Sequence, residues 1–180
     1  LWLTYFDSPN ASCFEALLAQ EDVDCNVIHD HELGMGGANL LIVASDEARF
    51  PIGKDAYRAL VNHPGTDVNA QVEERTKVNM YQTFLVGDTA LHVAVSNLND
   101  LRNNGDRIVS MVLMLIEAGA DPMIKGSKKR GTVIDYFRRI RSGGNSFLDD
   151  RYGRRREPRT FKRHFDAIEA MLTAKTASAV

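Results

Sequence analysis

Apolar side chains recur at helical spacing in several separate segments of the chain. Between Pro158 and Ala174 they follow one another at intervals of four, three, three and one, at Phe161, Phe165, Ile168, Met171 and Leu172. These intervals place them on one face of an α-helix. The same kind of pattern predicts helices from Ile108 to Ala118 and from about Asp55 to Asn62.

The segment from Ala70 to Val86 follows a different period. Its second half alternates along a strand, with one side formed by Val78, Met80, Gln82, Phe84 and Val86 and the other by Lys77, Asn79, Tyr81, Thr83 and Leu85. Alternation of this kind is typical of a β-strand. Residues 73–76 have the composition of a turn. We therefore predict an extended β-hairpin that projects from the helices.

A short motif links these elements. Residues 87–94 read Gly-Asp-Thr-Ala-Leu-His-Val-Ala, and the helix that follows ends at Gly119-Ala120-Asp121. Thr89 is predicted to cap the first helix with its hydroxyl, and Leu91 to fill the core. His92 is predicted to hydrogen-bond to a neighbouring turn. Gly119 suits the left-handed residue that ends a helix.

This motif resembles the ankyrin repeat, whose signature Thr-Pro-Leu-His-x-Ala is followed by two short helices and a turn. Weaker copies begin at Gly37, with Asn39 as the predicted cap, and at Thr132. A half-repeat is predicted at about 12–36. The resemblance implies an all-α, ankyrin-like helical solenoid of three to four repeats, at about 37–86, 87–130 and a degenerate 131–174, within one domain spanning 1–180.

The repeats are longer than usual. Leu41 to Leu91 spans 50 residues and Leu91 to Ile134 spans 43, against about 33 in the family. Insertions in such repeats form loops on one face, which is often the binding face. We therefore expect function to reside in the hairpin and in the loops between paired helices, at about 45–54, 96–106 and 141–157.

Composition is that of a globular domain, with 44% hydrophobic residues and no apolar run long enough to cross a bilayer. The first residue is Leu1, so we expect the chain to be a segment of a longer protein. Cys13 and Cys25 fit free thiols in a reducing compartment, with a disulfide between them as the alternative. We expect an intracellular protein, cytoplasmic or nuclear, or in the host cell if the chain is a secreted effector, and we expect a monomer.

Charge is distributed unevenly. Residues 125–165 contain 14 Lys and Arg against 4 Asp and Glu, whereas residues 1–124 contain 7 against 18. The densest basic points are 128–130, Arg138 with Arg139, and Arg154, Arg155 and Arg156. A solvated face, an acidic protein partner, a phosphate-bearing ligand, a nuclear import signal and nucleic acid all fit this pattern.

Candidate catalytic chemistry is sparse. The run 29–32, His-Asp-His-Glu, offers metal ligands but no third ligand from elsewhere, and the glycines at 34–37 lack the lysine of a phosphate-binding loop. A thiol of Cys13 or Cys25 with His29 carries no protease signature. The sequence therefore predicts no catalytic residue, no metal and no cofactor.

The resemblance implies a protein–protein interaction module. We predict contacts from the hairpin, from inward-facing helix positions and from basic side chains of the last repeat; they are Arg75, Lys77, Met80, Tyr81, Phe84, Val43, Val93, Tyr136, Arg138 and Arg139. Aromatic residues dominate interface energies, which favours Tyr81 and Phe84 as anchors. The alternatives are a nucleic-acid or anionic-ligand binder that uses the basic end, and a targeting module of a larger enzyme or bacterial effector.

Overall fold

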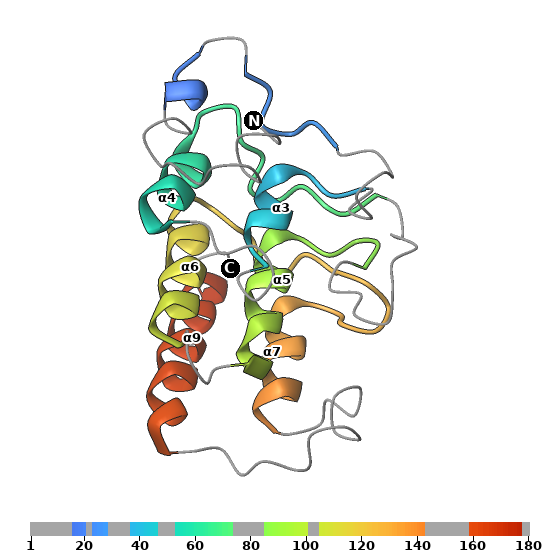
Figure 1. Cartoon of the computed structure of the whole chain (residues 1–180). Coiled ribbons are helices and arrows are strands. Elements are labelled where there is room, and N and C mark those ends of the chain that lie inside the picture. Colours follow the sequence, from blue (N-terminus) through green and yellow to red (C-terminus); the bar gives the residue numbers. More distant parts are fainter. Residues whose placement is uncertain are drawn as a thin grey trace.

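A computed structural model describes residues 16–20, 23–28, 37–46, 53–73, 85–100, 105–142 and 159–177 of the chain. Within these ranges the protein is all-α, with isolated β-bridges and no strand. Figure 1 shows the helices in two rows, with α3, α5 and α7 in one and α4, α6 and α9 in the other. The predicted all-α class is confirmed for this part of the chain.

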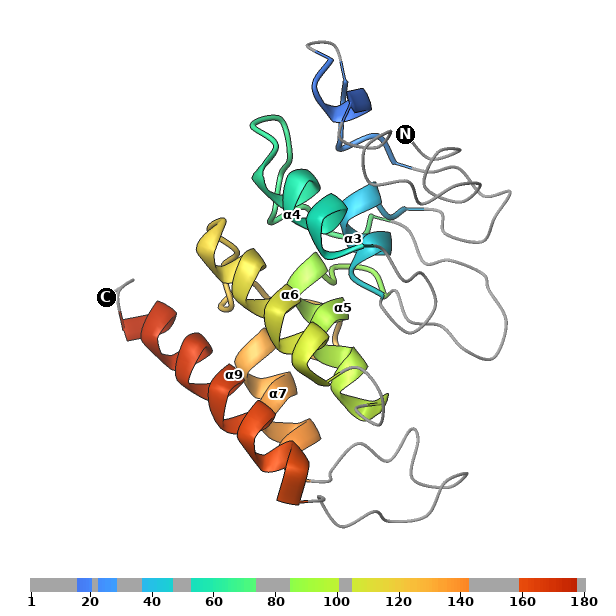
Figure 2. The ribbon, with the colours of Figure 1, turned by 60° about the vertical axis from the view of Figure 1, so that its left-hand side comes forward.

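Successive helices form pairs, one member in each row. The first pair is α3 (Leu40–Ala44) and α4 (Lys54–Asn62), the second is α5 (Ala90–Ser96) and α6 (Gly105–Glu117), and the third is α7 (Val133–Arg141) and α9 (Arg159–Ala177). A 3-10 turn, η2 (Asn97–Asp100), continues α5. Neighbouring pairs pack along both rows, α5 between α3 and α7, and α6 between α4 and α9 (Figure 2).

A polar side chain caps the first helix of each pair. The Asn39 Oδ1 accepts the Ile42 N–H at 2.9 Å at the start of α3. Thr89 caps α5, and Thr132 caps α7 by accepting the N–H of Asp135 at 3.2 Å. Each such cap contributes about 1 kcal/mol to helix stability. The caps predicted at Asn39 and Thr89 are confirmed.

The core runs continuously between the two rows. The first helices contribute fully buried side chains such as Leu41 and Leu91, and the second helices contribute Leu60, Leu115 and Ile168. Burying one such side chain stabilises the fold by roughly 1.5–3 kcal/mol. The core is therefore shared between consecutive helix pairs and is not confined to any one of them.

Asparagine side chains join consecutive turns at the ends of the second helices. The Asn69 Nδ2 donates to the Gly119 carbonyl at 3.3 Å, and its Oδ1 accepts the Asp121 N–H at 2.8 Å. Asn26 makes the equivalent two bonds to the turn at 65–67, at 2.6 and 2.8 Å. These bonds fix the offset of one turn against the next.

The ladder of asparagines stops at Met123. This residue follows Asp121 as Asn69 follows Asp67, and each aspartate accepts the N–H of the residue two positions on. Met123 has no side-chain amide, and 52% of it is exposed. The turn at 121–123 therefore lacks the side chain that would bond to a further turn.

Polar contacts of His164, Asp166 and Glu169 tie helix α9 to both neighbouring helices. The His164 Nε2 lies 2.8 Å from the Asp106 carboxylate at the start of α6. Arg141, in the last turn of α7, forms ion pairs with Asp166 at 2.6 Å and with Glu169. These contacts hold α9 against α6 of the second pair and against its own partner α7.

The predicted helices agree closely with those observed. The helix predicted at 55–62 begins one residue earlier, α6 begins three residues before Ile108, and α9 runs to Ala177 and not Ala174. Asp106 in the first turn explains why α6 extends beyond the apolar pattern, because an acidic side chain favours a helix N-terminus. None of the helices in the described ranges is long and apolar enough to cross a bilayer.

Candidate functional site

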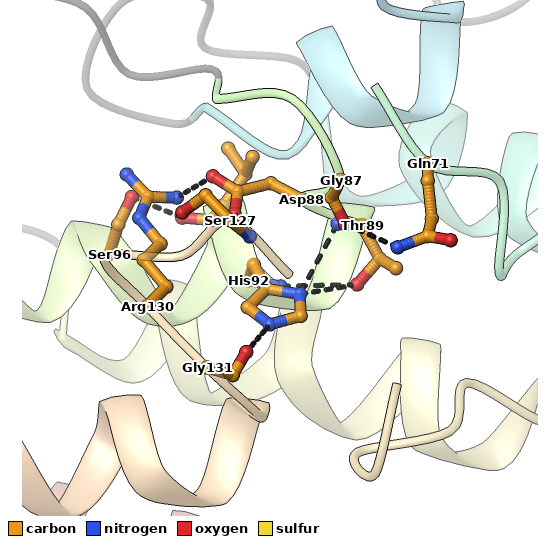
Figure 3. A network of polar contacts seen from close by, with 10 residues as sticks. Gln71, Gly87, Asp88, Thr89, His92, Ser96, Ser127, Arg130 and Gly131 are labelled. Atoms are coloured by element: carbon orange, nitrogen blue, oxygen red, sulfur yellow. Dashed lines mark hydrogen bonds and ion pairs between the residues drawn. The ribbon is translucent and has the colours of Figure 1, made fainter. Parts of the chain in front are cut away.

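The polar residues of the 87–94 motif are all engaged within the protein (Figure 3). Thr89 and His92 form a capping box, in which each side chain bonds the backbone of the other. The His92 Nδ1 accepts the Thr89 N–H at 3.2 Å, and the His92 N–H donates to the Thr89 hydroxyl at 3.4 Å. Since both residues are buried, the motif offers neither of them to a ligand.

His92 also reaches the following helix pair. Because its Nδ1 accepts from Thr89, the proton lies on Nε2, which donates to the Gly131 carbonyl at 3.0 Å. Burial lowers the pKa of His92, although the Gly131 carbonyl and Asp88 oppose that shift and Arg130 adds to it. His92 is therefore a neutral structural bridge, and the predicted hydrogen bond to a neighbouring turn is confirmed.

A buried ion pair lies beside this bridge. The Arg130 guanidinium is 2.6 Å from the Asp88 carboxylate, with 8% and 0% of the two side chains exposed. The second Asp88 oxygen accepts the Ser127 N–H at 3.0 Å, and Arg130 lies over the Tyr136 ring at 4.9 Å. The pair connects the start of α5 to the loop before α7.

That loop, residues 125–131, forms a tight finger between α6 and α7. The Gly126 N–H donates to the Gly131 carbonyl at 2.8 Å, and the Arg130 N–H donates to the Ser127 carbonyl at 2.9 Å. Arg139 on α7 donates to the carbonyls of Lys129 and, at 3.3 Å, of Arg130. We call residues 125–131 the second finger.

The predicted hairpin has a paired base. The Val72 N–H donates to the Asp88 carbonyl at 2.9 Å, and the Gly87 N–H donates to the Val72 carbonyl at 2.8 Å. Gln71 forms an isolated antiparallel bridge with Thr89, and its amide donates to the carbonyls of Gly87 and Lys125. The chain therefore leaves and returns to the same point. The hairpin itself, residues 74–84, lies outside the described residues, as do its predicted contacts Arg75, Lys77, Met80, Tyr81 and Phe84.

The structure corrects the prediction that inward-facing helix positions contact a partner. Val43 and Val93 are 0% exposed, and Tyr136 is 5% exposed under the Arg130 guanidinium. Val43 and Val93 lie on helices that pack on one another in the first row, so their side chains fill the core. None of the three offers a partner a side-chain surface in this conformation.

The predicted basic contacts divide into three groups. Arg138 is exposed on α7, whereas Arg139 is half-buried and holds the second finger. Arg154, Arg155 and Arg156 lie outside the described residues. The sequence identified Arg139 as a charge for a partner but gave no sign of its structural role, which depends on carbonyls nine and ten residues away.

Sequence reasoning also missed the part played by Asp88 and Arg130. Asp88 sits directly after the left-handed Gly87 and before the Thr89 cap, and Arg130 precedes the left-handed Gly131. The two glycines could have suggested that their neighbours occupy related turns. Nothing in the sequence shows that one turn faces the other.

One cysteine and one histidine do come together. The Cys25 Sγ lies 3.3 Å from the His63 Nδ1, but Cys25 is buried and its pKa is raised, mainly by that burial. A protonated, inaccessible thiol is a poor nucleophile. The run 29–32 and Cys13 lie outside the described residues, and among those described no three His, Cys, Asp or Glu side chains group as metal ligands do.

Comparison with known families identifies one segment. Residues 86–127 match the family model of the ankyrin repeat, from Val86 through α5 and α6 into the second finger. The resemblance drawn from the 87–94 motif is confirmed for this segment. No curated protein and no solved structure gave a significant match to the chain. Ankyrin repeats serve in general as non-catalytic protein–protein interaction modules.

Proposed function

We propose that this ankyrin-repeat chain is a protein–protein interaction module whose partner binds the hairpin between Ala70 and Val86. The proposal rests on one observation: the polar side chains of the repeat motif make their hydrogen bonds inside the fold and are not available to a partner. Thr89 and His92 cap a helix and bridge two helix pairs, and neither is exposed. We therefore expect a partner to contact the segments that project from the repeat, above all the hairpin between Ala70 and Val86.

We further propose that α3 with α4 and α7 with α9 are two more repeats of one solenoid. Their first helices carry caps at Asn39 and Thr132 that correspond to Thr89. The asparagine ladder through Asn26 and Asn69 supports this, because it repeats the same contact between successive turns. Solenoids of this kind present extended binding surfaces.

The base of the hairpin supports its role as a binding arm. Val72 and Gly87 are hydrogen-bonded across the base, and Glu73 donates its N–H to the Gly37 carbonyl at 3.0 Å. A fixed base limits the conformational freedom that a partner must restrict on binding. Met80, Tyr81 and Phe84 are the proposed apolar anchors, with Arg75 and Lys77 beside them.

We also propose that the interaction takes place inside the cell. Cys25 is a free, buried thiol, which fits a reducing compartment.

The test is affinity capture with the intact chain and with a variant in which residues 75–84 are replaced by a short Asn-Gly turn. The replacement keeps Val72 and Gly87, so the base can still pair. We expect partners identified by mass spectrometry with the intact chain to be absent from the variant. Equal recovery of the same partners by both proteins would refute a role for the hairpin.

Two point variants sharpen this test. Tyr81→Ser combined with Phe84→Ser should lower recovery of the partner to the level seen when residues 75–84 are replaced, because hot-spot aromatics carry most of an interface's binding energy. Asn79→Ser on the same segment is the matched control and should retain the partner. All variants should unfold at the urea midpoint of the parent chain.

A further inference from the structure

We propose that the second finger, together with Arg138, is a docking surface for an acidic segment of a partner protein. This inference rests on the proposed function and extends it to a second surface and a defined partner chemistry. Lys125, Lys128, Lys129 and Arg138 are all exposed, and three of them fall within five residues of one finger. An acidic segment complements such a surface in charge and is drawn to it over long range.

The finger is rigid because its backbone is bonded on several sides. Gln71, at the base of the hairpin, donates to the Lys125 carbonyl at 3.0 Å. The Ser127 N–H is held by Asp88, and Gly131 donates its N–H to the Ser127 carbonyl at 2.9 Å. A preorganised loop loses less conformational entropy on binding.

Arg139 links the finger to α7. Its guanidinium spans the carbonyls of Lys129 and Arg130, so the tip of the finger lies against the helix that carries Arg138. Arg138 is the preceding residue on α7 and is exposed to solvent. We therefore assign Arg139 a positioning role, in which it sets where the exposed cations stand.

Among the described residues, two carboxylates near the finger make contacts within the fold. Asp88 holds Arg130 and the Ser127 N–H in the core. The Asp135 carboxylate accepts the Thr132 hydroxyl at 2.7 Å at the start of α7. Asp88 therefore adds no exposed negative charge to this surface, whereas Asp135 is exposed and its carboxylate is held by the Thr132 hydroxyl.

The observations favour an acidic peptide over a nucleic acid. Single-stranded nucleic acid is held by aromatic side chains on which bases stack. The aromatic residues beside the finger, Tyr136 and Phe137, are 5% and 1% exposed, and Arg130 covers the tyrosine ring. The described part of this surface therefore has exposed cations that can attract carboxylates, but no exposed aromatic ring on which a base could stack.

The test is fluorescence anisotropy on the full chain with a labelled peptide rich in Glu and Asp. We expect binding that weakens as salt is raised, because exposed charges are screened. Lys128→Glu combined with Lys129→Glu should weaken binding at least about tenfold, which corresponds to about 1.4 kcal/mol. Lys54→Glu, an exposed position on α4, is the control and should change affinity by less than about twofold.

A conservative variant tests the positioning role. Arg139→Lys keeps the charge but cannot span two carbonyls as the planar guanidinium does. It should weaken peptide binding several-fold, because the finger is no longer preorganised, while leaving the salt dependence unchanged. An unchanged affinity in Arg139→Lys would overturn the role of the fixed finger.

The remaining outcomes are equally decisive. Failure of the acidic peptide to bind at low salt overturns the inference, as does tighter binding of a labelled single-stranded oligonucleotide of matched charge. The variant with residues 75–84 replaced should still bind the peptide. Loss of partner capture in that variant with retained peptide binding supports both proposals, whereas retained capture refutes only the role of the hairpin.

Discussion

Arg130 and Asp88 are 42 residues apart in the sequence, yet the guanidinium lies 2.6 Å from the carboxylate in the core. The contact joins the finger before α7 to the segment before α5, and so couples two helix pairs through charge as well as packing. His92, on α5, adds a second link between the same two segments by donating its Nε2 hydrogen to the Gly131 carbonyl. The position of the second finger therefore depends on residues of the matched repeat.

Removing one member of this ion pair should destabilise the fold strongly. Asp88→Asn keeps an oxygen for the Ser127 N–H but leaves Arg130 buried without its counter-charge. Breaking a buried pair in this way costs about 3–5 kcal/mol. The measurement is the free energy of unfolding in urea. The double variant Asp88→Asn with Arg130→Met should be more stable than the sum of the single effects predicts, and strict additivity would show that the two groups do not interact.

Gly126 is expected to tolerate no side chain. A Cβ at this position would lie 2.5 Å from the His92 Nε2 and 2.8 Å from the Asp88 Oδ1. Gly126→Ala must therefore displace the buried network and should cost about 1–3 kcal/mol, as overpacking does. Gly53→Ala is the control, because a Cβ there meets no atom within 4 Å. Equal urea midpoints for the two variants would contradict the observed packing.

The part of the fold predicted from sequence is the part that depends on local rules. Apolar spacing located α4, α6 and α9, and capping chemistry located Asn39 and Thr89, because both act over a few residues. The left-handed Gly119, with φ of +99°, follows from the same reasoning.

The candidate site was harder to predict because it depends on contacts between distant segments. The repeat pattern places Val93 at an inward-facing position, which we predicted to contact a partner. The packing of α5 against α3 and α7 shows that this side chain is instead buried in the core. Likewise, the sequence predicts that Arg139 is a surface charge, whereas in the structure its guanidinium donates to two carbonyls of the second finger. A charge pattern gives the number of cations but cannot divide them into those that hold a loop and those that face solvent.

Acid should destabilise the chain through His92. Burial lowers its pKa in the folded state below the usual 6.5, so the unfolded chain binds the proton first as pH falls. Stability is therefore fully present above about pH 6.5 and declines as pH drops through that value, by at most about 1.4 kcal/mol per pH unit. The decline ends below the folded-state pKa.

Urea unfolding of the parent chain and of His92→Gln, between about pH 7.5 and pH 5, measures this effect. The variant is less stable at neutral pH because it loses the bridge to Gly131, but it has no imidazole to protonate. The difference between the two proteins should therefore shrink as pH falls. Parallel curves over the whole range would show that His92 does not titrate differently on folding.

Cys25 should resist thiol reagents in the folded chain. Its side chain is 1% exposed and its pKa is raised by burial, so both access and thiolate formation are suppressed. In a Cys13→Ser background, iodoacetamide labelling followed by mass spectrometry should be much slower in buffer than in denaturing urea. Similar rates under the two conditions would contradict the burial of this thiol.

The asparagine ladder should be a measurable part of the stacking energy. Asn69→Ala removes the acceptor of the Asp121 N–H and the donor to the Gly119 carbonyl, two contacts between turns about fifty residues apart. Since these groups lie near the surface and water can replace part of each bond, we expect a loss of about 1 kcal/mol in the free energy of unfolding. Asn62→Ala, an exposed asparagine at the end of α4, should change it by less than about 0.5 kcal/mol. Hydrogen exchange adds a local measurement, because the Asp121 amide should exchange faster in Asn69→Ala while amides within α6 keep their protection. If Asn62→Ala and Asn69→Ala behave alike in both measurements, the ladder contributes nothing to the association of successive turns.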